Sequence, residues 1–146
     1  MSQPKIDPSQ IGSTAVRQVV SAVMGPTTGT ATRAINNVPP VITDGVEIGT
    51  CTINLTSATS HVLYTAAANI DTSTNNRNLI FMIFRDSVCI GASQVFCANA
   101  NTAESISRSR YDFPATTGPV TYSIRAAADA ATTWYINTNE IGRAHV

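Results

Sequence analysis

The sequence predicts an all-β protein built as an antiparallel β-sandwich, and three observations indicate this. The stretch 78–86 contains six consecutive apolar residues, Leu79 to Phe84, so both faces of a strand there need cover from water. From about Val46 onward, apolar and polar residues alternate with a period of two. Helical periodicity is almost absent, so the chain lacks the helices that would cover a buried parallel sheet.

The apolar stretch 79–84 also indicates an oligomer. A second sheet of the same sandwich covers one face of this strand, and we expect another copy of the chain to cover the other face. Arg85 follows directly and either faces solvent or pairs with an acidic residue of a neighbouring subunit, such as Glu104 or Glu140. The residues predicted to form the subunit interface are Leu79, Phe81, Ile83, Arg85, Tyr122, Trp134 and Tyr135.

The strands are expected to be short and regularly spaced, with turn residues between them. Each turn is rich in Gly, Pro, Asn, Asp or Ser, and no fixed internal repeat is visible. This spacing is typical of a sandwich or jelly roll. The predicted strands cover 51–55, 62–70, 79–84, 88–97, 105–113, 120–128 and 132–140.

Residues 1–45 differ in pattern from the remainder and are predicted to form an N-terminal arm, with the sandwich domain at 46–146. A short helix is expected at 13–24, because Val16, Val19, Val20, Val23 and Met24 follow the spacing of one helix face. Ser13 or Thr14 can cap the helix, and Gly25-Pro26 ends it. The Thr-rich and Pro-rich stretch up to residue 40 reads as an extended linker.

The composition bounds the class of protein. The 146 residues suit one domain, and only 12% are charged, about half the usual share, whereas threonine occurs 20 times. Nine basic and nine acidic residues balance without forming blocks, so we expect no nucleic-acid partner. We also expect synthesis in a cytoplasm without membrane insertion, because no signal peptide or transmembrane-length apolar run is visible.

The residues predict no catalytic or metal site. The three cysteines lack C-x-x-C spacing and are expected to be free thiols, and the two histidines stand near no catalytic motif. The run 71–75 resembles a calcium loop only faintly, and a solvated loop is the better interpretation. We therefore expect no enzyme activity and no cofactor. Trp134 and Tyr135 are adjacent and must face opposite sides, so one of them can face a sugar or a neighbouring subunit.

Three segments resemble those of trimeric jelly-roll domains of the tumour-necrosis-factor-like or C1q-like type found in phage virions. They are the hairpin 84–91 (FRDSVCIG), the strand 119–125 (PVTYSIR) and the closing strand 134–140 (WYINTNE). The resemblance covers about 46–141, and Ser87 and Val120 depart from its usual pattern. It implies a homotrimer in which one sheet of each sandwich faces the threefold axis.

The resemblance implies a bacteriophage structural protein of the virion, made in the host bacterial cytoplasm. We expect a capsid decoration (cement) protein that binds the major capsid protein or another virion protein. The arm residues expected to contact the capsid are Val16, Val19, Val20, Val23 and Met24. A short tail or head fibre is the alternative within this class, and a module that binds a surface glycan is the alternative outside it.

Overall fold

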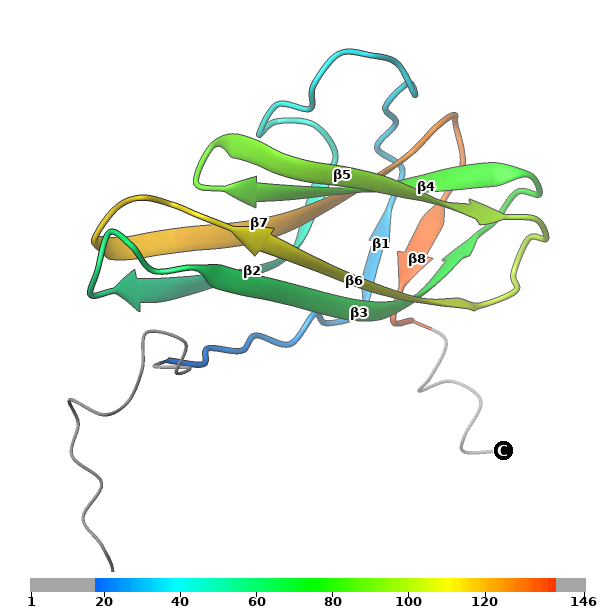
Figure 1. Ribbon diagram of the computed structural model, residues 1–146. Coiled ribbons are helices and arrows are strands. Elements are labelled where there is room, and N and C mark those ends of the chain that lie inside the picture. Colours follow the sequence, from blue (N-terminus) through cyan, green and yellow to red (C-terminus); the bar gives the residue numbers. More distant parts are fainter. Residues whose placement is uncertain (1–17, 139–146) are drawn as a thin grey trace, which may run out of the picture.

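A computed structural model of the protein describes residues 18–138 and has two four-stranded antiparallel sheets that pack face to face (Figure 1). This confirms the predicted all-β sandwich. The strands are β1 (Thr27–Gly29), β2 (Val46–Leu55), β3 (Val62–Thr72), β4 (Arg77–Arg85), β5 (Val88–Cys97), β6 (Glu104–Asp112), β7 (Gly118–Ala128) and β8 (Trp134–Ile136).

The strand order is that of a jelly roll. Sheet A has the order β1-β8-β3-β6, and sheet B has the order β2-β7-β4-β5. Apart from the β4–β5 hairpin, each strand is followed in the chain by a strand of the other sheet. This crossing between two antiparallel sheets distinguishes a jelly roll from a simple meander. The turn of the hairpin has Asp86 at a φ of 52°.

The seven strands predicted from the sequence are present, with differences at their ends. The last one ends at Ile136 rather than at residue 140, because Asn137 takes a φ of 53° and its side chain accepts a hydrogen bond from the Asn69 N–H at 2.8 Å. Strand β1 was not predicted, since three residues are too few to show an alternating pattern.

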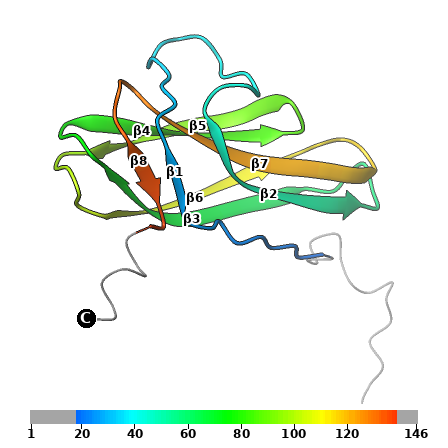
Figure 2. The same ribbon diagram turned by 180° about the vertical axis from the view of Figure 1, so that it is seen from behind.

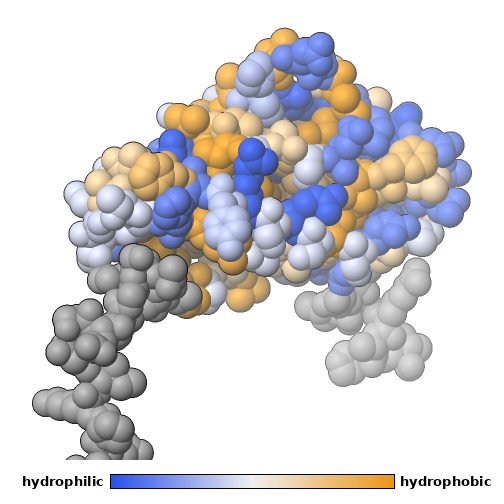
Figure 3. All heavy atoms as spheres, in the orientation of Figure 1, coloured by the Kyte–Doolittle hydropathy of each residue, from blue (hydrophilic) through white to orange (hydrophobic). Residues whose placement is uncertain are grey.

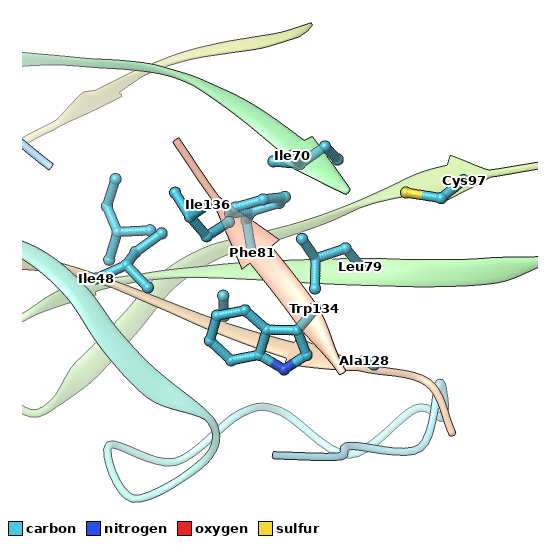
Figure 4. Packing of buried hydrophobic residues seen from close by; sticks show 10 residues of the cluster. Ile48, Ile70, Leu79, Phe81, Cys97, Ala128, Trp134 and Ile136 are labelled. Atoms are coloured by element: carbon cyan, nitrogen blue, oxygen red, sulfur yellow. The ribbon is translucent and has the colours of Figure 1, made fainter. Parts of the chain in front are cut away.

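The main core lies between the two sheets, and Trp134 is its largest fully buried side chain (Figure 4). The indole Nε1–H donates to the Ala31 carbonyl at 3.2 Å, which satisfies its only polar group. The ring lies directly against Gly29, where an added Cβ would come within 2.1 Å of the indole Cζ2. Strand β1 therefore needs a glycine at this position so that its backbone can approach the tryptophan.

The outer face of β4 is covered by the chain itself. Ile80, Met82 and Phe84 point away from the inter-sheet core, yet at most 5% of each is exposed. They pack with Ala31 and Ile42, which belong to the segment 31–45, here called the strap. Figure 1 shows the strap above sheet B. The expectation that a second copy must cover this face is wrong, because the N-terminal part of the same chain does so.

Backbone hydrogen bonds and ion pairs fasten the strap. The Arg33 N–H donates to the Ala128 carbonyl at 2.8 Å, and the Ala128 N–H donates to the Ala31 carbonyl at 2.9 Å. The Arg33 Nε lies 3.0 Å from Asp44 Oδ2, and Arg125 donates from Nε to the Asp44 carbonyl at 2.8 Å. With β1 in sheet A, residues 27–45 are part of the sandwich, so the packing does not follow the predicted boundary between 1–45 and 46–146.

The predicted helix at 13–24 is wrong for residues 18–24, which are not helical; residues 13–17 lie outside the described part. β-branched valines weaken a helix, and residues 18–23 are exposed, so no packing surface stabilises a helix there. Met24 packs between the sheets, where an added Cβ on Gly49 would meet its Cγ at 2.8 Å. Its carbonyl accepts a hydrogen bond from Asn137 Nδ2 at 2.9 Å.

Acid is expected to loosen the strap through Asp44. The Val41 N–H is the largest of the causes that lower the pKa of Asp44, and Arg33 adds to it. A carboxyl with a lowered pKa stabilises the fold above its unfolded-state pKa of about 4, and this contribution is lost as the pH falls through the folded pKa. We expect Asp44→Asn to be less stable than the parent at pH 7 and to lose less stability on acidification, in urea unfolding series from about pH 7 to 3. Equal losses in the two proteins would contradict this role.

Candidate functional site

Most of the residues predicted to form a subunit interface are buried inside the single chain. At most 7% of each of the five is exposed, and they belong to the sandwich interior: Leu79, Phe81, Ile83, Tyr122 and Trp134. Arg85 and Tyr135 are half-buried. Any interface between copies of this sandwich therefore needs surface residues beyond those predicted.

Arg85 bridges the two sheets within the chain. Its Nη1 donates to both carboxylate oxygens of Asp112, at 3.0 and 3.1 Å, and the Tyr122 hydroxyl donates to Asp112 Oδ2 at 2.7 Å. Burial, and then the hydrogen bond to Asp112, raises the pKa of Tyr122 above its ordinary value, so the hydroxyl remains a neutral donor. This ion pair answers the open question about Arg85: among the described residues, its partner belongs to the same chain.

The outer face of sheet A is open and uncharged over most of its area. Because successive side chains of a strand alternate, every second residue of β3 and β6 points outward. Thr65 Oγ1 and Ser109 Oγ lie 3.3 Å apart, and Ser105 Oγ donates to Asn69 Oδ1 at 2.7 Å, so small polar groups pair across the strands. The outward residues of the paired stretch are Leu63, Thr65, Ala67, Asn69, Ser105, Ser107, Ser109 and Tyr111, none of them charged.

One corner of this face carries apolar and aromatic side chains. Leu63 and Tyr111 are directly opposite in the register and are 56% and 74% exposed. The next pair outward, His61 and Phe113, stacks with ring centroids 4.9 Å apart, and Phe113 is 50% exposed. These four residues are here called the aromatic corner. Tyr135 lies on the same face, opposite Asp71 and Thr28 in the register.

A sequence signal for the aromatic corner existed. Leu63 stands next to Val62 and so breaks the alternation of apolar residues, and Tyr111 continues a series of serines at every second position. An apolar residue in a polar series of one strand face indicates a surface that is covered by something else.

The arginine side chains of β6 point toward the edge of the sandwich and away from the outer face of sheet A. Arg108 donates from Nε to Ser93 Oγ at 3.1 Å, and an added Cβ on Gly91 would lie 3.0 Å from the Arg110 Cδ. Both arginines therefore reach toward β5 of the other sheet. Charged side chains that point inward at an edge strand discourage edge-to-edge pairing, so the outer face of sheet A is the more favourable surface for association.

The described residues offer little reactive chemistry. Within 18–138, no group of three or more His, Cys, Asp and Glu is placed to hold a metal ion, and no helix is long and apolar enough to cross a membrane. Burial raises the pKa of the Cys51 and Cys97 thiols, which keeps them protonated and weakly nucleophilic.

No protein-family model and no curated protein matches the chain. Among solved structures, a chain described as "CBM4 structure and function" has 15% identity and a TM-score of 0.43, covering 60% of this chain and 55% of that one. The sugar-binding C-terminal domain of EclA has 18% identity and a TM-score of 0.40, covering 82% of this chain and 79% of that one. Infectious bursal disease virus, Gt strain, has 13% identity and a TM-score of 0.40, covering 94% of this chain and 36% of that one.

This chain thus spans about half the length of the first of these structures and about a third of the viral one. At these identities and TM-scores the likenesses say nothing about role. The strand order and the packing define the class of protein: an all-β jelly-roll sandwich.

Proposed function

We propose that the chain is a structural protein of a bacteriophage virion, a capsid decoration protein that trimerises through the outer face of sheet A. The observation that carries the proposal is the contrast between the two outer faces. The strap covers the outer face of β4 in sheet B, whereas sheet A presents an uncharged face with exposed Leu63 and Tyr111. Exposed apolar residues on an uncharged face are typical of a surface that is buried in an assembly.

The motif resemblance supports a trimer, since it implies that one sheet of each sandwich faces the threefold axis. The apolar strand 79–84 lies in sheet B, and the strap covers its outer face. The proposed interface is therefore the outer face of sheet A, on which Tyr135 is the one predicted interface residue.

The proposed contacts with the capsid come from the N-terminal part of the chain. Val19 and Val23 are 81% and 94% exposed, Val20 is 38% exposed, and Val16 lies outside the described residues. Met24 packs against the core between the sheets and is therefore not accessible to a capsid. The tip of the strap adds exposed apolar side chains at Ile35, Val38 and Val41. The strap forms the projection at the top of Figure 3, on which hydrophobic and hydrophilic residues are mixed.

Tyr111→Asp is expected to dissociate the trimer. The substitution removes a 74% exposed aromatic ring and places a charge on the uncharged face, so the dissociation constant rises at least about tenfold, or about 1.4 kcal/mol. Sedimentation equilibrium of parent and variant measures it. Val88→Asp is the matched control, because Val88 is 55% exposed on the other sheet, at the β4–β5 turn. A parent that sediments as a monomer at micromolar concentration rejects the assembly.

The capsid role has its own test. Val38→Asp places a charge at the tip of the strap, where the side chain is 64% exposed, and it leaves Ala31 and Ile42 over β4. Deletion to residue 40 would instead expose the outer face of β4. We expect the Val38→Asp protein to remain a trimer and to lose co-sedimentation with undecorated phage heads. Full-length trimer that fails to bind heads, but is found in purified tails by mass spectrometry, would support the fibre alternative.

A glycan-binding role is the second candidate, and the aromatic corner is the observation that favours it. A stacked His61–Phe113 pair beside an exposed Tyr111 offers flat apolar surface next to hydroxyl groups. A glycan array with the parent and with Phe113→Ala decides this point. Binding to a defined glycan that is lost in the variant supports the role, and absence of binding by the parent removes it.

A further inference from the structure

Strand β3 is paired along most of its length on one side only. It pairs with β6 from Val62 to Ile70, but with β8 only from Ile70 to Thr72. On the side away from β6, the Asn69 N–H bonds to Asn137 Oδ1, and the Asn69 carbonyl accepts from the Asn137 N–H, both at 2.8 Å. Sheet A is therefore wide at one end and only two strands wide at the other.

The free part of this edge has a defined set of backbone groups. In an antiparallel ladder, alternate residues direct their N–H and C=O to opposite sides. Since those of Asn69 point away from β6, the backbone groups of Leu63, Thr65 and Ala67 do so too. No described strand pairs with them. A row of unpaired N–H and C=O groups is a template for an additional strand.

The segment 18–23 ends near this free edge, and in the structure it is not a strand and makes no backbone hydrogen bond to β3. It is followed by Met24, whose carbonyl accepts a hydrogen bond from Asn137 and whose side chain lines the same cavity between the sheets as Ala66 and Ala68. Figures 1 and 2, seen from opposite sides, both show the segment, in blue, running from the end of β1 along the sandwich on the side of β3 and β2. Because β1 is antiparallel to β8, and β8 is antiparallel to β3, the segment runs parallel to β3.

The sequence of this segment suits a strand. Gln18-Val-Val-Ser-Ala-Val-Met24 is rich in β-branched residues and has no charge, proline or glycine. Residues 18–23 are all exposed, with Val20 at 38% and Val19 and Val23 at 81% and 94%, whereas Met24 is half-buried. In a strand that turns Met24 into the sandwich, Val19 and Val23 would lie on the outer side of sheet A, beside Leu63 and Ala67.

We propose that residues 18–23 complete sheet A as an additional strand, paired in parallel with the free edge of β3 at residues 63–67. This inference rests on the proposed function in one respect: the outward Val19 and Val23 enlarge the uncharged face that the trimer buries. The same residues were expected to bind the capsid as part of a free arm. In the completed sheet they belong to the subunit interface instead.

Amide hydrogen exchange measured by NMR on the full-length protein tests the strand. We expect the amides of Leu63, Thr65 and Ala67 to exchange at least about 100-fold more slowly than unprotected amides. In a strand, only one of two neighbouring residues directs its N–H toward β3. Ser21→Pro and Ala22→Pro therefore remove the donor in one register or the other, and they test whether protection of these amides depends on the added strand. At least one of the two is expected to raise their exchange rates about tenfold or more.

The neighbouring amides of Tyr64, Ala66 and Ala68 are the internal control, because they face β6 and should not change. Ser21→Thr and Ala22→Ser are the matched variants that keep the N–H and should behave as the parent. Fast exchange at 63, 65 and 67 in the parent, or protection that survives both proline variants, would overturn the proposal.

Sedimentation of the same samples separates the strand from the assembly. Protection in a parent that is monomeric supports the strand and rejects the trimer. A trimeric parent whose amides at 63, 65 and 67 exchange freely supports the assembly and rejects the strand.

Discussion

Replacing Trp134 with alanine is expected to lower the free energy of unfolding by about 3–5 kcal/mol. The side chain is fully buried, and it joins three parts of the fold: it lies against Gly29 of β1, bonds the Ala31 carbonyl at 3.2 Å, and packs into the inter-sheet core. Its removal leaves a cavity, and the Ala31 carbonyl at the start of the strap keeps only its hydrogen bond from the Ala128 N–H. Urea unfolding followed by circular dichroism measures the loss.

The matched control for this substitution is Tyr135→Ala. Tyr135 is the next residue, it is aromatic and half-buried, and it faces outward from sheet A. We expect its loss to cost the isolated subunit about 1 kcal/mol or less. Similar losses for the two variants would contradict the placement of Trp134 at the centre of the core.

Asp112→Ala is expected to cost about 2–4 kcal/mol, because it removes the carboxylate that accepts hydrogen bonds from two partners. Arg85 loses both of its hydrogen bonds to the carboxylate, and the buried Tyr122 hydroxyl loses its bond of 2.7 Å. Asp112 lies in sheet A, whereas Arg85 and Tyr122 lie in sheet B, so the substitution weakens the connection between the sheets. Thermal and urea unfolding measure the effect.

Two further variants define the origin of that loss. Glu47→Ala removes an ion pair with Arg125 that spans 4.0 Å and whose glutamate is 46% exposed, so a change within about 0.5 kcal/mol is expected. In a double-mutant cycle with Tyr122→Phe, the combined loss should be smaller than the sum of the single losses. An additive cycle would show that the Tyr122–Asp112 bond contributes nothing.

The strands were predictable because their signal is local. Alternating residues such as Cys51, Ile53 and Leu55, and turn residues such as Gly118-Pro119, require only neighbours in the chain to be recognised. The apolar strand 79–84 correctly indicated burial on both faces. What covers the second face depends on contacts between residues 38 to 53 positions apart in the chain, through Ala31 and Ile42, and alternation carries no information about such contacts.

The candidate site was less predictable than the fold, and for the same reason. Tyr122 and Trp134 were assigned to an interface because large aromatic residues are common in cores and interfaces alike. Only the register shows that Trp134 points inward and Tyr135 outward. The aromatic corner joins residues from two strands about 50 positions apart, Leu63 and Tyr111 among them, which become neighbours only when β3 pairs with β6.

The sequence by itself determined that this protein is an all-β sandwich with a strand buried on both faces, because strand periodicity and turn chemistry are local properties of the chain. Only the tertiary structure decided that the strap buries the outer face of that strand and that sheet A keeps its outer face open. It also decided that Arg85 pairs within the chain, with Asp112. Each of these depends on which distant segments pack together. Such packing is decided by the free energy of the whole folded chain and not by the local residue pattern.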